Sequence, residues 1–436
     1  MSNPTDATVT QWGKARSVAS FRALSMLGSE MTVFALVLRE RSHGATFVSV
    51  LMACGTVSLV VMVPLAGWIS DRFTTRQIIP FTSLLQSALI FSLIYQHNLI
   101  LLTITIFLSS SCGAVENPAL MALIPTLVKK EDYSKQMGFA QTLYAFASLF
   151  APALGGILVS QTGYKTPFIC DSLSFIVLAS APALLKVNRV PIAAGGSTKV
   201  KATEGLKYIF KNRYLRSLAV LIAAFLFAAG TIQIGNLFLL TKILHTSVLI
   251  YGLSGAAFAL GMIVGGIALM QVKIKESQQA RLVVLVLVVT SFLIMGMSVA
   301  GHWSIVVILD IFAGLMISVL TNLISTIFIQ RSPGQMRGRI GAALNAFINT
   351  GMIGALLISG PILDWLGARK LLAVAGVAAL LLIGNIGLGG FISFGFRSFS
   401  RRCRIFCALL CRWLLVDQSK ILGINQSGTQ KHKANA

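Results

Sequence analysis

Four acidic residues lie inside long apolar stretches of this sequence, where a charge is costly: Glu30, Glu116, Asp171 and Asp310. A carboxyl group in apolar surroundings can bind and release a proton near neutral pH. We therefore expect Glu30, Glu116 and Asp310 to couple a proton or to bind a substrate. Each has an alternative role as an acid that holds helices together. For Asp171 and Asp310 the pattern favours an anchor near the end of a segment.

Two residues close to these acids bear on how the acids work. Arg22 precedes Glu30 by about two helical turns on a similar face. It could neutralise an acid, but we expect its long side chain to reach the polar boundary of the apolar segment instead. Pro118 follows Glu116 by two residues and can kink a helix there, which would place Glu116 at a bend.

The composition excludes most soluble proteins. The 436 residues are 56% hydrophobic and only 11% charged, and the mean hydropathy is +0.82. Soluble domains carry about 25% charged residues. The net charge of +23 then indicates contact with anionic membrane lipids rather than with nucleic acid.

Apolar runs of about 20 residues, long enough to cross a bilayer, occur twelve times. We therefore predict an all-α membrane protein with twelve transmembrane helices in two pseudo-symmetric six-helix bundles. The predicted spans are 17–38, 46–69, 78–96, 99–127, 138–160, 167–185, 217–241, 248–271, 282–300, 304–329, 341–364 and 371–393.

The basic residues predict how the chain is oriented. The termini and the connecting loops that the twelve spans place on one side of the membrane hold 29 Lys and Arg residues. The loops on the other side hold 6. Cytoplasmic loops carry such an excess, so we expect both termini inside a cell-membrane protein. The predicted organisation is a cytoplasmic N-terminus (1–16), a six-helix bundle (17–185), a cytoplasmic linker (186–216), a second bundle (217–393) and a basic cytoplasmic tail (394–436).

The two halves contain similar short elements. The run Gly155-Gly-Ile-Leu158 recurs as Gly360-Pro-Ile-Leu363, and Leu143-Tyr-Ala-Phe146 recurs as Leu344-Asn-Ala-Phe347. Chance similarity between Leu-, Ala- and Gly-rich helices is the alternative explanation. Duplicated halves are typical of proteins with a central site between two lobes.

The loop after the second predicted span contains Gly67, Asp71, Arg72 and Arg76 at spacings of four, one and four residues. This arrangement resembles the signature loop of the major facilitator superfamily. The resemblance implies the twelve-helix fold and a cytoplasmic gating role for these four residues. Thr74 and Gln77 depart from the family pattern. A positive-inside loop without a gating role is the alternative reading.

Further runs narrow the resemblance to the drug, macrolide and enterobactin exporter branch of that superfamily. One run is Pro118-Ala-Leu-Met-Ala-Leu-Ile-Pro125, and another contains Pro152, Gly155 and Gly156 in the pattern of an antiporter motif of the fifth helix. The resemblance implies proton-coupled efflux of an amphipathic small molecule by alternating access. The alternatives are a lysophospholipid or nutrient transporter of the same fold, or a non-transporting membrane sensor.

Other functions lack their sequence signals. No phosphate-binding loop, Gly-x-Ser-x-Gly or His-Glu-x-x-His motif occurs, so we expect no enzyme, no cofactor and no metal site. We expect a monomer whose partners are a small-molecule substrate, protons and lipids. In the tail, 405–416 is too short to span a bilayer and is predicted to lie at its surface.

Overall fold

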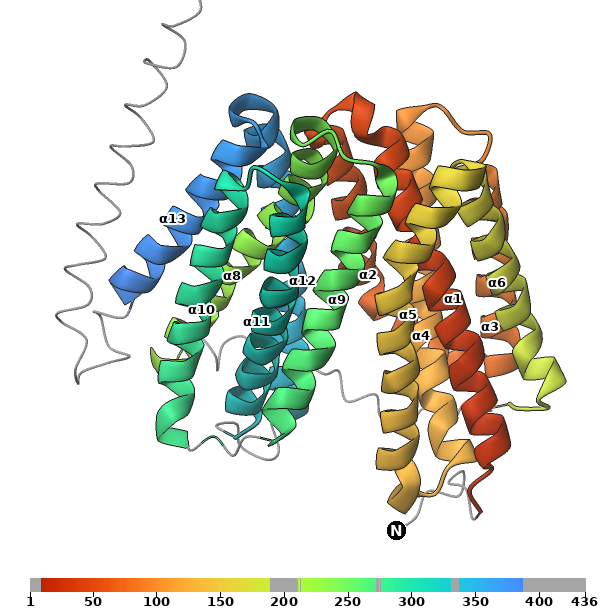
Figure 1. Cartoon of the computed structure of the whole chain (residues 1–436). Coiled ribbons are helices and arrows are strands. Elements are labelled where there is room, and N and C mark those ends of the chain that lie inside the picture. Colours follow the sequence, from red (N-terminus) through yellow and green to blue (C-terminus); the bar gives the residue numbers. More distant parts are fainter. Residues whose placement is uncertain are drawn as a thin grey trace, which may run out of the picture.

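Two groups of helices lie side by side in the computed structural model (Figure 1). The structure describes residues 9–188, 211, 213–271, 274, 276–330 and 337–386. Most of the predicted linker 186–216, the tail 394–436 with its surface segment, and residues 1–8 lie outside this description. All regular elements in the described ranges are helices.

The long helices follow the predicted spans one by one. Their bounds are α1 Trp12–Glu40, α2 Ala45–Arg72, α3 Thr75–Ser92, α4 Leu99–Leu127, α5 Tyr133–Thr162, α6 Lys165–Leu184, α8 Arg213–Phe238, α9 Val248–Gln271, α10 Glu276–Val299, α11 Trp303–Gln330, α12 Arg337–Leu366 and α13 Ala368–Ile386. Several run a turn beyond the apolar stretch because polar residues at a bilayer surface still favour helical backbone. The third ends four residues earlier than expected, and the Asn98 side chain then caps α4 by accepting from the Ile100 N–H at 2.9 Å.

Within the described ranges, nine of these helices are long and apolar enough to cross a membrane by length and composition alone. The remaining three are α3, α8 and α13. In α3 the polar side chains gather on a buried face, at Thr82, Ser83, Gln86 and Ser87. These residues lower the hydropathy of α3, and their buried positions point to polar partners on a neighbouring helix.

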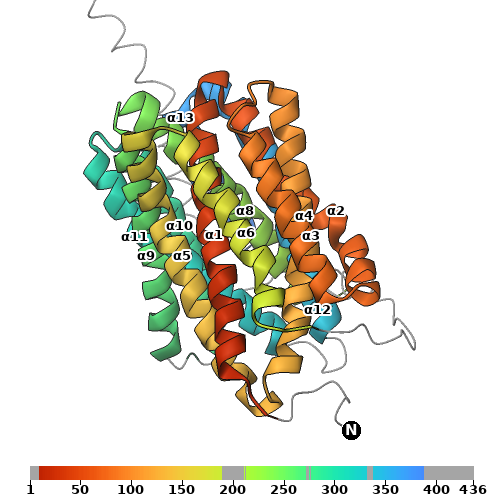
Figure 2. The same cartoon turned by 90° about the vertical axis from the view of Figure 1, so that its right-hand side faces the viewer.

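The packing repeats between the two halves, which confirms the predicted pseudo-symmetry. In the first bundle α1 packs on α5 and α6, α2 on α4, and α3 on α4 and α6. In the second bundle α8 packs on α12 and α13, α9 on α11, and α10 on α11 and α13. These are the same pairs, with α8 to α13 in the places of α1 to α6. The contacts between bundles also form a symmetric pair, α5 with α9 and α2 with α12 (Figures 1 and 2).

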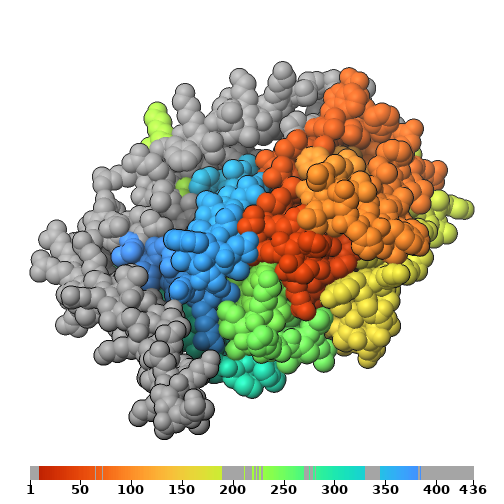
Figure 3. All heavy atoms as spheres, turned by 90° about the horizontal axis from the view of Figure 1, so that it is seen from above, coloured from red at the N-terminus to blue at the C-terminus, as the bar shows by residue number. Residues whose placement is uncertain are grey.

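The bundles share a core at one end of the molecule. There Val37 and Leu38 of α1 and Val48 of α2 join Leu237 and Leu372 of the second bundle in one buried cluster. This end carries the turns at 41–44, 163–164, 244–247 and 367. Toward the opposite end each bundle has its own core, and the two groups of helices diverge (Figure 1). Figure 3 views the shared end, where the first two helices adjoin the second bundle.

Glycines bring the two bundles close together along α5 and α9. A Cβ on Gly252 of α9 would lie 2.5 Å from the Pro152 carbonyl oxygen, and one on Gly156 would lie 3.3 Å from the Val248 carbonyl oxygen. Side chains at either glycine would therefore force the helices apart. Gly155 faces away from this contact, toward Phe34 of α1. The predicted helix-5 motif thus lies at the junction of the bundles.

Candidate functional site

Glu30 lies in the middle of α1 with an exposed side chain. Within the part of the chain that the structure describes, no residue forms an ion pair or hydrogen bond with its carboxylate. One turn further along α1, the Phe34 ring stacks on Tyr251 of α9 at a centroid distance of 5.0 Å. Residues four apart share a helix face. Glu30 therefore faces toward the second bundle, beside the junction.

Glu116 is enclosed within the first bundle, with 0% of its surface exposed. Its Oε1 atom accepts from the Arg22 guanidinium at 3.1 Å. Its Oε2 atom accepts from Ser83 at 2.6 Å and from Thr82 and Gln86 at 3.3 Å each. The buried polar face of α3 therefore satisfies one acid on α4.

The pair formed by Arg22 and Glu116 corrects the expectation that Arg22 reaches the membrane boundary. A carboxylate left alone in this interior would be far more costly than a guanidinium that turns inward to pair with it. Arg22 remains 23% exposed at its side chain. Pro118 lies inside α4, which continues from Leu99 to Leu127, and the bend expected there stays a prediction.

Asp310 occupies a second buried polar centre, where α8, α9 and α11 meet. Its carboxylate accepts from the Asn236 amide at 2.9 and 3.1 Å and from the Ser254 hydroxyl. No basic side chain in the described ranges pairs with it. Asp310 lies about two helical turns after Trp303, where α11 begins, and is only 1% exposed, so it joins three helices near this end of the second bundle.

The predicted gating loop joins the end of α2 to the start of α3. The Arg72 guanidinium lies over the Trp68 ring, 4.5 Å from its centroid. Gln77 forms a capping box with Thr74 at the start of α3, which accounts for both departures from the family pattern. Arg76 is exposed, and nothing lies within 4 Å of a Cβ placed on Gly67. The side chain of Asp71 lies outside what the structure describes.

An acid that the sequence analysis missed joins the bundles at their shared end. Asp364 of α12 accepts from the backbone N–H groups of Ala45 at 2.9 Å and Thr46 at 2.8 Å, and from the Thr46 hydroxyl at 2.6 Å. It thereby caps the positive end of α2 from the other bundle. Gly44, which precedes α2, has no side chain for this purpose and has a φ of +97°. The sequence signal for this contact was Gly44, which leaves the start of α2 without a capping side chain of its own.

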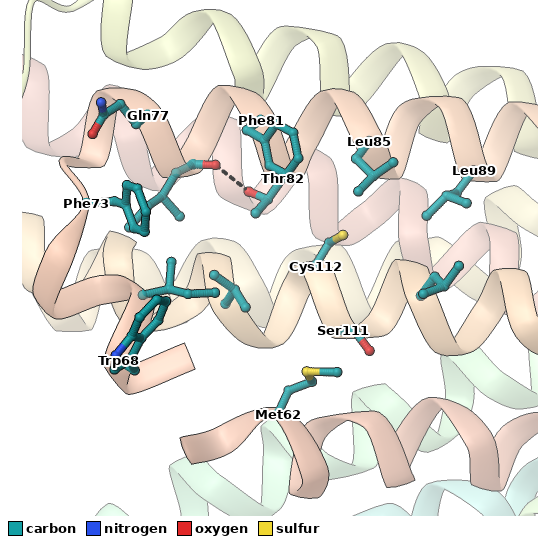
Figure 4. Close-up of a pocket in the computed structure, with 14 residues that line it drawn as sticks. Met62, Trp68, Phe73, Gln77, Phe81, Thr82, Leu85, Leu89, Ser111 and Cys112 are labelled. Atoms are coloured by element: carbon teal, nitrogen blue, oxygen red, sulfur yellow. Dashed lines mark hydrogen bonds between the residues drawn. The ribbon is translucent and has the colours of Figure 1, made fainter. Parts of the chain in front are cut away.

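An apolar groove opens on the side of the first bundle, between α2, α3 and α4 (Figure 4). Its volume is about 590 Å³, and Trp68, Phe73, Phe81 and Leu85 line it together with Cys112. Its wall includes Thr82, whose hydroxyl also reaches Glu116. The groove suits an acyl chain or another apolar group better than a charged solute.

The pair formed by Arg22 and Glu116 can be tested by thermal unfolding. Arg22→Met should lower stability by about 3 kcal/mol because it leaves a buried carboxylate without its cation. Glu116→Gln in the same background should restore most of that loss. The measurement is a double-mutant cycle on purified protein. If the changes in the free energy of unfolding caused by the two substitutions were additive, the pairing would be contradicted.

The cap formed by Asp364 can be tested by the distance between the bundles. Loss of a cap costs about 1–2 kcal/mol, so Asp364→Ala should increase the population that is open at this end by about tenfold. Spin labels at residues 41 and 370, one on each bundle, should show this as a longer distance in pulsed electron resonance. Asp132→Ala, which removes a half-buried acid hydrogen-bonded to Thr10, is the control. Unchanged distances in Asp364→Ala would rule out a closing role.

Comparisons with known proteins agree with this architecture. A sequence profile described as Major Facilitator Superfamily matches residues 18–353. Macrolide efflux protein A of Streptococcus pyogenes is 22% identical over 386 residues, covering 83% of this chain and 92% of that protein. The staphyloferrin A transporter of Staphylococcus aureus is 23% identical over 239 residues, covering 53% and 59%.

Among solved structures, the nucleoside transporter NupG superposes with a TM-score of 0.67 at 12% identity, covering 89% of this chain and all of that one. At that identity the likeness shows the fold alone, and it agrees with the two-bundle packing described above. The profile match covers most of the chain and includes the gating loop, the helix-5 motif and Glu30. The chain therefore belongs to the Major Facilitator Superfamily and is a multi-pass membrane transporter rather than an enzyme.

Proposed function

We propose that this transporter exports amphipathic small molecules in exchange for protons, with Glu30 as the exchanging group. The observation that carries the proposal is the exposed Glu30 carboxylate, which faces the second bundle and has no partner among the described residues. Such a group can hold a proton or the cationic part of a substrate, but not both. Competition for one carboxylate couples the two movements in opposite directions.

The contacts at the shared end support the alternation that this exchange needs. The cap from Asp364, the stack of Phe34 on Tyr251 and the contact of Pro152 with Gly252 all join the bundles there. We propose that this end faces outward and that the linker 186–216 is cytoplasmic, since the Lys and Arg excess lies on the opposite side. Release of these contacts would open Glu30 to the outside.

Glu116 has a supporting role in this proposal. Its pairing with Arg22 ties α1 to α3 and α4, about two turns from Glu30. A change in the tilt of α1 would be transmitted to those helices. We propose the same kind of role for Asp310 in the second bundle, where it joins α8 and α9 to α11. Asp71, Arg72 and Arg76 are proposed to hold the cytoplasmic end when the outer end opens.

The driving force is sufficient for such a cycle. One proton that crosses a potential of about 150 mV supplies roughly 3.4 kcal/mol. At 1.4 kcal/mol per tenfold change, this supports roughly a 250-fold gradient of a neutral substrate. A monovalent cation exchanged one for one would be driven by the pH difference alone, because no net charge then crosses the membrane. Similarity to a protein named macrolide efflux protein A favours export and an amphipathic substrate.

Lysophospholipid translocation is a second candidate, and the groove between α2, α3 and α4 favours it. The groove is apolar and opens on the side of the bundle, with Trp68 in its wall (Figure 4). The Arg72 guanidinium lies over the Trp68 ring. An acyl chain would fit the groove, and Arg72 could bind an anionic headgroup.

The proposed exchange predicts the effect of removing one charge. Glu30→Gln should lower energised efflux of ethidium or radiolabelled erythromycin from cells at least tenfold, because the amide cannot bind a proton or a cation by charge. Glu30→Asp should retain part of the activity. The matched control is Glu131→Gln, which removes an exposed acid between α4 and α5. Efflux is measured with and without an uncoupler.

Two results of this assay would contradict the proposal. One is a Glu30→Gln variant that pumps at the wild-type rate and is still stopped by the uncoupler. The other is a wild-type protein that moves neither compound. Flipping of fluorescent lysophosphatidylglycerol in proteoliposomes, in the absence of drug efflux, would favour the second candidate instead.

A further inference from the structure

A polar stripe runs along the face of α1 that packs on α6. Ser25, Gly28, Ser29 and Thr32 are spaced three, one and three residues apart, which places them on one side of a helix. The two helices are neighbours throughout this region (Figure 2). Residues 25–32 lie near the middle of α1, so the stripe lies deep within the membrane-spanning part of the protein.

Asp171 of α6 faces this stripe and is completely buried. Ser29 and Ser174 place their hydroxyls beside its Oδ1 atom, and Thr32 also neighbours the carboxylate. No basic side chain in the described ranges pairs with Asp171. It therefore differs from Glu116, whose charge is balanced by Arg22.

Several oxygen atoms of this interface have no partner. Of six buried side-chain atoms without a hydrogen bond in the described part of the chain, three belong to these residues: Oδ2 of Asp171, Oγ1 of Thr32 and Oγ of Ser25. Buried polar atoms without a partner cost about 1–3 kcal/mol each. Thr32 Oγ1 and Asp171 Oδ2 lie close to each other across the interface of α1 and α6, so one bound group would satisfy both.

Oδ1 of Asp171 has no close hydrogen bond from either serine, because the Ser174 hydroxyl donates to the Asp171 backbone carbonyl oxygen at 2.7 Å instead. The Ser29 and Ser174 hydroxyl oxygens lie 3.4 and 3.3 Å from Oδ1, whereas O–H···O bonds are about 2.7–2.8 Å long. Oxygens that surround a cation at about 2.4 Å lie about 3.4 Å apart. A Cβ on Gly28 would lie 2.7 Å from Oδ1 and 2.9 Å from the Ser174 hydroxyl, so only glycine leaves both oxygens in place.

We propose that Asp171 with Ser29, Thr32 and Ser174 forms a binding site for a sodium ion between α1 and α6. A single carboxylate balances one positive charge, which matches a monovalent cation. Hydroxyl and carboxylate oxygens are the ligands that hard cations prefer. The site is separate from Glu30, although Ser29 is adjacent to it in α1. The expectation from the sequence that the chain holds no metal ion would then be wrong.

Sodium binding can be measured directly on the purified full-length protein. Binding of ²²Na⁺ should saturate, and NaCl should raise the thermal unfolding temperature by about 3 °C relative to KCl or choline chloride at equal ionic strength. Asp171→Asn and Gly28→Ala should abolish both effects. Thr32→Val, which keeps the shape of the side chain, should weaken sodium binding at least fivefold even if Asp171→Asn fails to fold.

The matched control is Ser172→Ala, which removes a neighbouring buried hydroxyl on α6 that already bonds to Ser87. This variant should bind sodium like the wild type. Wild-type protein that binds no ²²Na⁺, or Thr32→Val with unchanged affinity, would overturn the proposal. Stabilisation by low pH without any effect of sodium would also overturn it. None of these measurements depends on transport, so they are independent of the role proposed for Glu30.

Discussion

A buried carboxylate must find a partner, and this requirement organises the interior of both bundles. The chain has 13 acids in 436 residues, and four of them lie deep within helices. Glu116 is matched by Arg22 and the polar face of α3, and Asp310 by Asn236 and Ser254. Each match joins helices that are far apart in sequence, so the acids fix how α1, α3 and α4, or α8, α9 and α11, lie against one another.

Two of the four acids stay incompletely satisfied by side chains of the described residues. Glu30 is exposed beside the junction of the bundles, and Asp171 is enclosed but retains an oxygen without a partner. Glu30 belongs to α1, and Asp171 contacts the adjacent residue Ser29 of the same helix. A change of ligand at either acid would alter the forces on this helix, which packs on α5 and, through Phe34, on α9.

The closed end of the molecule depends on backbone groups rather than on apolar side chains alone. Asp364 caps α2, and glycines on α5 and α9 allow backbone contact across the junction. Contacts of this kind are made or lost as a unit, since a small tilt removes every hydrogen bond to a helix end. They suit a boundary that opens and closes.

The sequence predicts the helices well because bilayer thickness sets their length, and each span is visible as an apolar run of about 20 residues. Each of the twelve predicted spans overlaps one long helix, and the repeated elements predicted the symmetric packing. The largest difference at a helix start is at α10, which begins at Glu276 instead of residue 282, and residues 387–393 of the last span lie outside the described ranges. The partner of Arg22 was missed because pairing depends on how helices rotate against one another. The cap on α2 was missed because its two sides are 319 residues apart, although Gly44 left the helix start without a capping side chain.

Exchange of a proton for a substrate at Glu30 is the central step of the proposed transport cycle. Proton movement in proteoliposomes with a pH-sensitive dye inside tests this most directly, with ethidium added to vesicles that carry an imposed proton gradient. The wild type should release protons in step with ethidium transport. Glu30→Gln should neither release protons nor transport ethidium. Ethidium transport by the wild type without proton movement, or equal proton release by Glu30→Gln, would contradict the account.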